Sequence, residues 1–311
     1  MSAATTTPTG RLAPPSTRGD AVRWAEARLA GAAAAGASAG PWLSRARFEA
    51  LYLLGGCLGE GAAEVAVWPE RTLDVAAWAE FRRRVTRRAR GEPLQYIEGR
   101  AAFRELSLRV DRRALIPRPE TEELVEVVLE WSSGRSGLTA LDLGTGSGAL
   151  ALSLVLEGPF ERVVAVDISP AALNLAEENA REAACGTRVE FRAGALFDPL
   201  SSEERFDVIV SNPPYVAAGD VALLAAEVRE WEPPAALFAG PTGLEVLERI
   251  VDRAASFLRP GGLCALEVGA GQAHAVSDRL RRTGGFVGVS AHRDAAGLER
   301  IVCAEREGGG G

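Results

Sequence analysis

The residues best suited to chemistry in this chain are Asn212, Pro213, Pro214 and Tyr215. They follow an apolar run, residues 206–211, that is typical of a buried strand. Neither proline has an N–H to give to a strand ladder, so the chain must turn there. The turn displays an amide side chain, free carbonyls and an aromatic ring, which suit a planar group that carries N–H donors. The same residues are equally consistent with an ordinary loop that ends a strand.

A second candidate site is the glycine-rich stretch 142–148, between a predicted strand at 139–143 and a predicted helix at 148–157. Glycines there allow a tight turn and a close approach of a ligand. Their spacing differs from the dinucleotide fingerprint, in which the third glycine comes one residue later. Asp142 also places a negative charge in the loop. The stretch therefore favours a ligand that is cationic or rich in hydroxyl groups over a phosphate.

Asp167 ends the next predicted strand, residues 162–167. A carboxylate at that position can accept hydrogen bonds from both ribose hydroxyls of a nucleoside. Together with the glycine-rich stretch it favours an adenosine ligand with an amino-acid part and no pyrophosphate, which fits S-adenosylmethionine. The alternatives are a helix cap for Asp142 and an exposed strand end for Asp167.

The elements that must position these residues alternate between strand and helix from residue 120 onward, which predicts a doubly wound sheet. The other predicted helices are 170–184, 244–258 and 275–283, and the other strands are 189–192, 262–268 and a terminal pair at 286–289 and 300–304. The predicted domains are a disordered lead-in at 1–18, a helical domain at 19–93, a β-hairpin linker at 94–115, the α/β domain at 116–306 and a disordered tail at 307–311.

The predicted helical domain rests on three stretches of helical patterning. The first contains Val22, Ala25 and Leu29, the second ends at Gly55 and Gly56, and the third runs from 74 to 90. Turn signals at Gly36, Gly40 and Pro41 separate the first two. Six arginines between 82 and 90 give the third helix a basic face. Such a face is either a solvated surface or a docking surface for an acidic or ribonucleoprotein partner.

Composition excludes several classes of protein. The chain has 311 residues, 47% hydrophobic and 25% charged, and contains no apolar run of the roughly 18 residues that a membrane span needs. The four cysteines are scattered singly, which indicates neither a zinc site nor a disulfide framework and fits free thiols in a reducing cytosol. Two isolated histidines give no metal site.

Charge is divided unevenly along the chain. Residues 1–115 hold 18 Arg against 12 acidic residues, whereas residues 116–311 hold 17 Arg against 30 acidic residues, a net charge of −13. An acidic second half argues against a clamp on the phosphates of nucleic acid.

The motifs 142–148, Asp167 and 212–215, in that order, resemble those of a class I methyltransferase that acts on amino groups. The stretch Leu-Ile-Pro-Arg-Pro-Glu-Thr-Glu at 115–122 is more specific. It is similar to the signature of the protein-(glutamine-N(5)) methyltransferases that modify peptide-chain release factors, the HemK/PrmC family. Further matches lie at 91–99, 231–233 and 293–294, and the resemblance spans residues 44–304.

The resemblance implies a class I S-adenosylmethionine-dependent methyltransferase fold. This fold has a doubly wound, mostly parallel sheet with a terminal antiparallel strand, and here it is joined to a small N-terminal helical domain that helps to hold a protein substrate. The residues that it assigns to S-adenosylmethionine are Gly144, Thr145, Gly146, Ser147 and Gly148 for the methionine part, Asp167 for the ribose, Leu196 beside the adenine, and Asn212. The chain departs from the family at Ala195, where an acidic residue is common, and at Arg104-Glu105, where an aromatic-glycine pair is common.

The resemblance also implies a mechanism with Asn212, Pro213 and Tyr215 as catalytic residues. The Asn212 side-chain oxygen accepts one N–H of a glutamine amide, and the Pro213 carbonyl accepts the other. Pro214 and Tyr215 pack on the flat faces of the amide, so the substrate site comprises residues 212–215. The rate then comes from positioning and a preset electrostatic environment, without a general base or a metal.

The implied activity is methyl transfer to the glutamine of the Gly-Gly-Gln tripeptide in release factors. The implied enzyme is cytoplasmic and monomeric, with no membrane partner and no direct contact to nucleic acid. The alternatives are methylation of a ribosomal-protein glutamine, of DNA adenine, whose methyltransferases share the Asn-Pro-Pro-Tyr turn, or a binding module that has lost activity.

Overall fold

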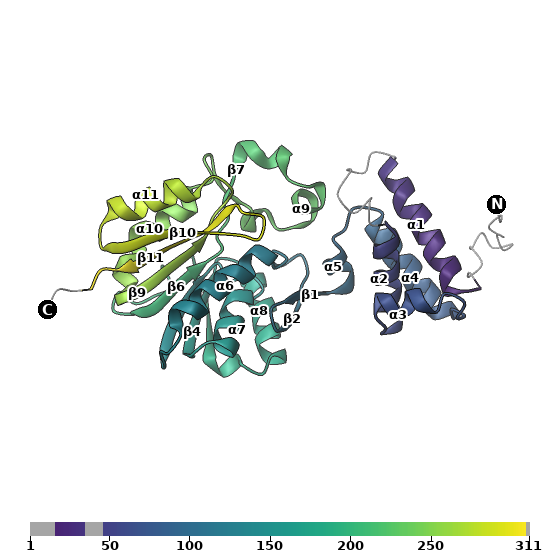
Figure 1. The fold of residues 1–311 in the computed structure, drawn as a ribbon, viewed down its shortest axis with the longest axis horizontal. Helices are drawn as coiled ribbons and strands as arrows, with labels where there is room; N and C mark the ends of the chain where they lie inside the picture. Colours follow the sequence, from purple (N-terminus) through teal and green to yellow (C-terminus); the bar gives the residue numbers. More distant parts are fainter. Residues whose placement is uncertain (1–15, 35–45, 309–311) are drawn as a thin grey trace. The chain divides into compact units, whose positions relative to one another are not determined.

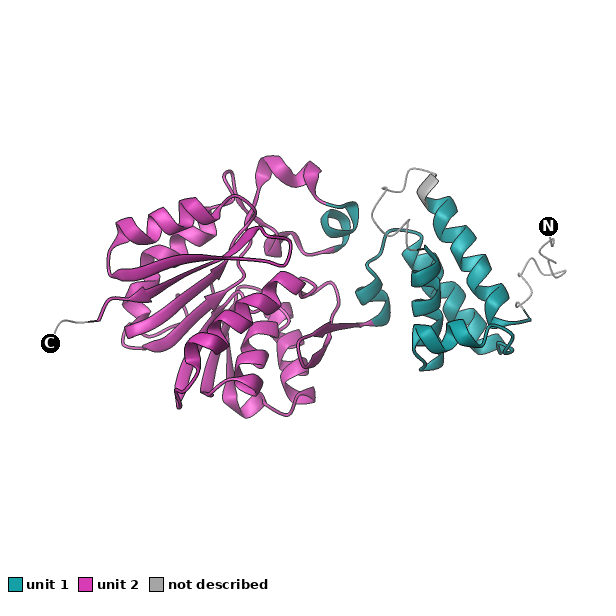
Figure 2. Cartoon of the chain, in the orientation of Figure 1, with its two compact units in different colours: residues 1–98, 225–231 teal, residues 99–224, 232–311 magenta. Residues whose placement is uncertain are grey.

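The computed structural model describes residues 16–34 and 46–308 and divides the chain into two compact units (Figures 1 and 2). The first unit contains the chain up to Glu98 together with the segment 225–231, and the second contains 99–224 and 232 onward. Three predicted features lie outside the described residues, namely the lead-in up to residue 15, the turn signals at Gly36, Gly40 and Pro41, and the tail from residue 309. None of the described helices is long and apolar enough to cross a membrane.

The first unit is helical. Its elements are α1 (Arg18–Ala34), α2 (Ala46–Leu58), α3 (Ala62–Val67), α4 (Val75–Arg88), α5 (Leu94–Glu98) and, from the later segment, α9 (Ala226–Trp231). The predicted helical spacing of Val22, Ala25 and Leu29 is confirmed, because all three are buried in one core with residues of α2 and α4. Asp74 caps α4 by accepting a hydrogen bond from the Ala77 N–H at 2.7 Å.

The prediction that a helix ends at Gly55 and Gly56 is wrong, because α2 runs through both to Leu58. The two glycines allow neighbouring groups to approach the backbone of α2 closely and do not end the helix. A Cβ added at Gly56 would clash with Glu98 Oε2 and would lie 2.7 Å from Arg84 Nη1. Those two side chains form an ion pair at 2.7 Å, so the pair occupies the space that a larger residue in α2 would need.

The predicted hairpin linker at 94–115 is partly wrong, because its first five residues form the helix α5. The Ile97 N–H donates to Pro93 O at 3.1 Å and closes the first turn. The hairpin itself consists of β1 (Arg100–Phe103) and β2 (Leu106–Arg109). At its tip, Arg104 has a φ of +48° and pairs with Glu157 at 2.7 Å. In this chain a salt bridge thus anchors the turn in which the family commonly has an aromatic-glycine pair.

Four of the five arginines of α4 form ion pairs, so most of the predicted basic face is neutralised. The residues Arg83, Arg84 and Arg87 pair with acidic residues of the same unit at 2.8 Å or less. Arg88 is buried, with Glu49 at 2.7 Å and Glu227 at 2.8 Å. Since Glu227 belongs to α9, this pair ties the segment 225–231 to the helical unit, whereas the sequence prediction places that segment in the α/β domain.

The second unit is built on a seven-stranded sheet with the order β10-β11-β9-β6-β3-β4-β5. The strands are β3 (Leu138–Leu143), β4 (Phe160–Asp167), β5 (Val189–Ala193), β6 (Phe206–Ser211), β9 (Leu258–Glu267), β10 (Phe286–Arg293) and β11 (Glu299–Arg306). Strand β11 is antiparallel to both of its neighbours, and the other pairings are parallel. The predicted doubly wound, mostly parallel sheet with a terminal antiparallel strand is therefore confirmed.

Helices cover both faces of this sheet (Figure 1). The helices on one face are α6 (Pro119–Ser132), α7 (Ala149–Glu157) and α8 (Pro170–Glu182), and those on the other are α10 (Glu245–Phe257) and α11 (Ala273–Thr283). Alternation along the strands separates the two layers, since Ala140 faces α6 and α7 while Leu141 faces α10 and α11. Sequence patterning assigned no helix to 119–132.

Two short strands, β7 (Val216–Ala217) and β8 (Phe238–Gly240), pair in parallel after the Asn-Pro-Pro-Tyr turn. Three short 3₁₀ helices complete the described elements, at Gly186–Arg188, Ala218–Leu223 and Pro234–Ala236. The main sheet winds outward in both directions from β3 and β6. The order reverses between these two strands, and open α/β sheets bind ligands beyond the carboxyl ends of strands at such a reversal.

Candidate active site

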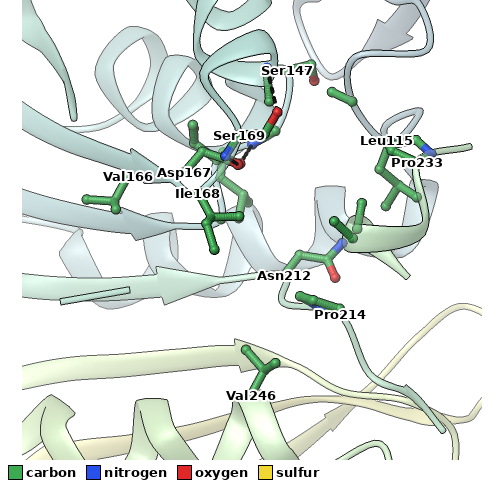
Figure 3. Close-up of a pocket in the computed structure, with 18 of the residues that line it drawn as sticks. Leu115, Ser147, Val166, Asp167, Ile168, Ser169, Asn212, Pro214, Pro233 and Val246 are labelled. Carbon is green, nitrogen blue, oxygen red and sulfur yellow. Dashed lines mark hydrogen bonds between the residues drawn. The ribbon is translucent and has the colours of Figure 1, made fainter. Parts of the chain in front are cut away.

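A cavity of about 380 Å³ lies beyond the carboxyl ends of β3, β4 and β6 (Figure 3). Gly144 follows β3, Asp167 ends β4 and Asn212 follows β6, and all three line the cavity. In the close-up, Asn212 and Pro214 lie together, apart from the run of Asp167 to Ser169. The topology thus brings three strand ends, separated by up to 68 residues, to one space.

Most of the predicted site residues line this cavity. Those that do are Gly144, Thr145, Gly146, Ser147, Asp167, Leu196, Asn212 and Pro214. Among the described residues, Gly148, Pro213 and Tyr215 are predicted members of the site that do not line it. Gly148 is the N-cap of α7 and has a φ of +87°.

The glycine-rich loop has a backbone that suits a close ligand. Gly144 and Gly146 have φ values of +76° and +56°, which disfavour any residue with a Cβ. A Cβ added at Gly144 would meet no atom within 4 Å, so it would stand in the open cavity. The N–H groups of Gly144 and Thr145 donate to Val166 O at 2.8 and 3.0 Å and fasten the loop to β4.

Asp142 supports the loop from beneath and does not line the cavity. Its Oδ2 accepts hydrogen bonds from Thr145 Oγ1 at 2.6 Å and from the Ala151 N–H at 3.2 Å. Ala151 lies in the first turn of α7, so the helix-cap alternative for Asp142 describes its position. Complete burial raises the pKa of this carboxyl to about 7, against the lowering effect of the two hydrogen bonds.

Asp167 faces the cavity with acceptor capacity to spare. Its Oδ2 accepts from the Gly146 N–H at 2.9 Å and its Oδ1 from the Ser169 N–H at 2.8 Å. A carboxylate has about four lone-pair sites, so both oxygens can still accept from a ligand hydroxyl. Burial raises the pKa of Asp167 despite these backbone hydrogen bonds. It is the only acidic residue among the described residues that line the cavity, so no other acidic side chain there replaces the one absent at Ala195.

These features fit S-adenosylmethionine. Asp167 offers acceptors for ribose hydroxyls, and the Cβ-free loop leaves room for the methionine part. Apolar surface for a base comes from Ile168, Leu196 and Val246. Leu196 has a φ of +51°, an uncommon conformation for a residue with a Cβ.

The Asn212 amide is held by a chain of hydrogen bonds. Its Nδ2 donates to Thr121 Oγ1 at 2.9 Å, and that hydroxyl donates to Glu267 Oε2 at 2.6 Å. No described group donates to Asn212 Oδ1. The Asn212 carbonyl oxygen therefore remains available to a ligand N–H.

Tyr215 lies on the far side of the same chain of hydrogen bonds. Its Oη is 3.5 Å from Glu267 Oε1, and its ring packs on the core that α10 and α11 share with the sheet. Burial and the nearby Glu267 raise the pKa of Tyr215 to about 12. The backbone carbonyl of Tyr215 accepts from Gln272 Nε2 at 3.0 Å, which fixes the end of the turn.

Thr121 and Glu267 are site residues that the sequence analysis did not identify. Thr121 lies inside the stretch 115–122, which was selected for its resemblance without a role for this residue. Glu267 is the last residue but one of the predicted strand 262–268 and the last residue of β9. An acidic residue at the end of an apolar strand was an available signal, because a buried carboxylate requires partners.

Two separate stretches of the resemblance meet at the cavity. Glu232 accepts a hydrogen bond from the Ile116 N–H at 3.1 Å and pairs with Arg118 at 2.5 Å. Leu115 and Pro233, which adjoin these residues, line the cavity (Figure 3). The ion pair thus joins the segments 115–118 and 232–233 into one wall.

Comparisons with known proteins agree with this arrangement. The model of a family described as "Methyltransferase domain" matches residues 135–281, and that of the "PrmC N-terminal domain" matches residues 20–99. The chain is 42% identical over 264 residues to the release factor glutamine methyltransferase of Moorella thermoacetica, with 85% of this chain and 93% of that protein covered. It is 41% identical over 260 residues to the protein of the same name from Geobacter sulfurreducens, with 84% and 89% covered.

A solved structure of low sequence identity shares the fold. The Thermus thermophilus 16S rRNA N2 G1207 methyltransferase, in complex with AdoMet and guanosine, superposes with a TM-score of 0.50 at 23% identity. The match covers 67% of this chain and 50% of that one. Together with the matching domain model, this likeness confirms the class I methyltransferase fold.

Proposed function

The chain belongs to the family of release factor glutamine methyltransferases, and we propose that it methylates the glutamine of the Gly-Gly-Gln tripeptide in a peptide-chain release factor. The acceptor atom is the side-chain amide nitrogen. The observation that carries this proposal is the free Oδ1 of Asn212 on the wall of a cavity that the glycine loop and Asp167 also line.

S-adenosylmethionine supplies an electrophilic methyl group on its sulfonium. Gly144, Gly146 and Ser147 would hold its methionine part, and Asp167 its ribose. Leu196 lines the same cavity, as expected for a residue beside the adenine. The fit of these residues to the ligand supports the assignment.

The work of Asn212 and Pro213 is to orient a poor nucleophile. An amide nitrogen reacts weakly because its lone pair is delocalised into the carbonyl. Asn212 Oδ1 would accept one N–H of the glutamine, and the Pro213 carbonyl the other. These bonds would hold the nitrogen in place and favour the positive charge that develops on it. Pro214, on the wall, and Tyr215, behind it, would confine the flat amide.

The names of the relatives favour a release factor over a ribosomal protein as the substrate. The acidic charge of residues 116–311 disfavours DNA. We place the enzyme in the cytoplasm, as a monomer that binds release factors without direct contact to nucleic acid. The helical domain of residues 20–99 would help to hold the protein substrate.

The direct test is methyl transfer to a purified release factor, followed by mass spectrometry of its peptides. The expected product carries one extra methyl on the tripeptide glutamine. A release factor with Gln→Ala in the tripeptide should remain unmodified. Modification of that control, or of a ribosomal protein in preference to the release factor, would overturn the proposal.

A further inference from the structure

Glu267 is a buried carboxyl that the proposed function leaves without a role. It ends β9, is only 1% exposed and pairs in the sheet with Ile301 of β11. A buried carboxylate is costly unless its oxygens have partners. Its two oxygens lie 2.6 Å from Thr121 Oγ1 and 3.5 Å from Tyr215 Oη. Both partners contact the Asn-Pro-Pro-Tyr turn or belong to it.

The direction of the hydrogen bonds follows from the inventory of donors and acceptors. An ionised carboxylate only accepts, so the single proton of the Thr121 hydroxyl is committed to Glu267. The hydroxyl can then only accept from Asn212, and the Asn212 group that faces it must be the NH₂. The amide oxygen consequently points away from Thr121.

The opposite orientation would present the wrong group to the substrate. An Asn212 amide rotated by a half turn would offer N–H donors to a glutamine NH₂, which also carries donors. The two groups would then repel each other. Because the two orientations of an amide have nearly the same shape, packing alone discriminates weakly between them.

We propose that Glu267, acting through the Thr121 hydroxyl, is a positioning residue that fixes the Asn212 amide with its oxygen toward the substrate. The proposal rests on the proposed function, because it explains how the acceptor in that reaction is held. Glu267 is 146 residues from Thr121 in the chain and Thr121 is 91 residues from Asn212, so the fold alone assembles this relay.

The test compares Thr121→Val, which removes the hydroxyl, with Thr121→Ser, which keeps it. We expect Thr121→Val to lower kcat about 10- to 100-fold, the range for loss of a hydrogen bond in a charged network. Thr121→Ser should recover activity to within about threefold of the wild type. The dissociation constant for S-adenosylmethionine, measured by calorimetry, should change by less than about threefold in both variants.

Ser132→Ala is the matched control, since Ser132 is a buried hydroxyl on the same helix, α6, and donates only to Leu129 O. It should retain full activity. Equal activity of Thr121→Val and Thr121→Ser would overturn the proposal. So would a parallel loss of kcat, cofactor affinity and thermal stability in Thr121→Val alone, which would indicate a merely structural role.

The action of Glu267 through Thr121 has its own test. Glu267→Gln can offer either an oxygen or an NH₂ to Thr121, so we expect kcat to fall about threefold to tenfold. In the double variant with Thr121→Val, the Gln substitution should cause no further loss of kcat, because the hydroxyl through which Glu267 acts is already absent. Additive losses would overturn the relay. An inactive wild type would instead defeat the proposed function, so the two failures are distinguishable.

Discussion

Two buried carboxyls in this molecule have the same local chemistry and different origins. Asp142 and Glu267 each accept a hydrogen bond from a threonine hydroxyl at 2.6 Å, and burial raises the pKa of each to about 7. The threonine that serves Asp142 is three residues away, whereas the one that serves Glu267 is 146 residues away. The carboxyl beneath the cofactor loop therefore finds its threonine within the same stretch of sequence, whereas the carboxyl beside the substrate turn finds its threonine only through the packing of α6 on the sheet.

The largest effect is expected from replacing Asn212, the hydrogen-bond acceptor that Glu267 orients through Thr121. Asn212→Ala should lower kcat by about 10²- to 10³-fold, the usual cost of losing one preset hydrogen-bonding group in an active site. Affinity for S-adenosylmethionine should remain within about threefold, because the glycine loop is supported separately. Methyl transfer in single turnovers and calorimetry measure the two quantities. Equal activity of the variant would refute the role of Asn212.

The next prediction is that Asp142 and Glu267 both make the stability of the protein depend on pH. Since their folded-state pKa values lie above the ordinary values, the stability that they contribute is fully present below pH 4 and is lost as pH rises through about 7. In the wild type, each carboxyl should lower the free energy of unfolding by about 3 kcal/mol between pH 5 and pH 8. Asp142→Asn and Glu267→Gln should each abolish the contribution of the carboxyl that is replaced. Urea unfolding across this range provides the measurement. An unchanged pH dependence in both variants would contradict the two raised pKa values.

Asp167→Ala tests the cofactor-binding loop without altering the Asn-Pro-Pro-Tyr turn. Loss of the ribose acceptor and of the bonds to Gly146 and Ser169 should weaken binding of S-adenosylmethionine by about 10- to 100-fold. At saturating cofactor, kcat should stay within about threefold of the wild type. A drop in kcat as large as that of Asn212→Ala would show that the loop and the turn are not independent.

The smallest expected effect is a pH dependence of kcat that arises from Glu267, beside the Asn-Pro-Pro-Tyr turn. Burial, and secondarily Glu120, raise the pKa of Glu267, while Thr121, Arg300 and Tyr215 act to lower it. A protonated Glu267 can donate to Thr121 and release the Asn212 orientation. We expect kcat to fall about tenfold from pH 8 to pH 6, as the ionised fraction of Glu267 declines.

The matched comparison for this pH dependence is Glu267→Gln, which has no proton to gain. The kcat of this variant should be nearly constant over the same pH range. At pH 8, where Glu267 of the wild type is ionised, the variant should have a lower kcat than the wild type. A wild-type profile that the substitution leaves unchanged would assign the pH dependence to another group.

Local sequence predicted the elements that depend on nearby residues. The strands at 139–143, 162–167 and 206–211 agree with β3, β4 and β6 to within two residues, because unbroken apolar runs mark strands buried on both faces. The helix ending at Gly55 and Gly56 was wrong because a distant ion pair, Arg84 with Glu98, decides what fits there. The short linker helix α5 was missed because its support is the burial of Tyr96 and Ile97.

The same division applies to the site. The sequence by itself determined the pairing of Asp142 with Thr145 beside the glycine loop and the proline turn that displays Asn212, since covalent geometry and a hydrogen bond between near neighbours suffice for these. Only the tertiary structure decided that β4 fastens the loop through Val166 and Asp167, that Glu267 and Thr121 flank the turn, and that four of the five arginines of α4 are paired within their unit. Which partner a buried polar group finds depends on which strand and helix ends the fold brings together, and no local pattern contains that information.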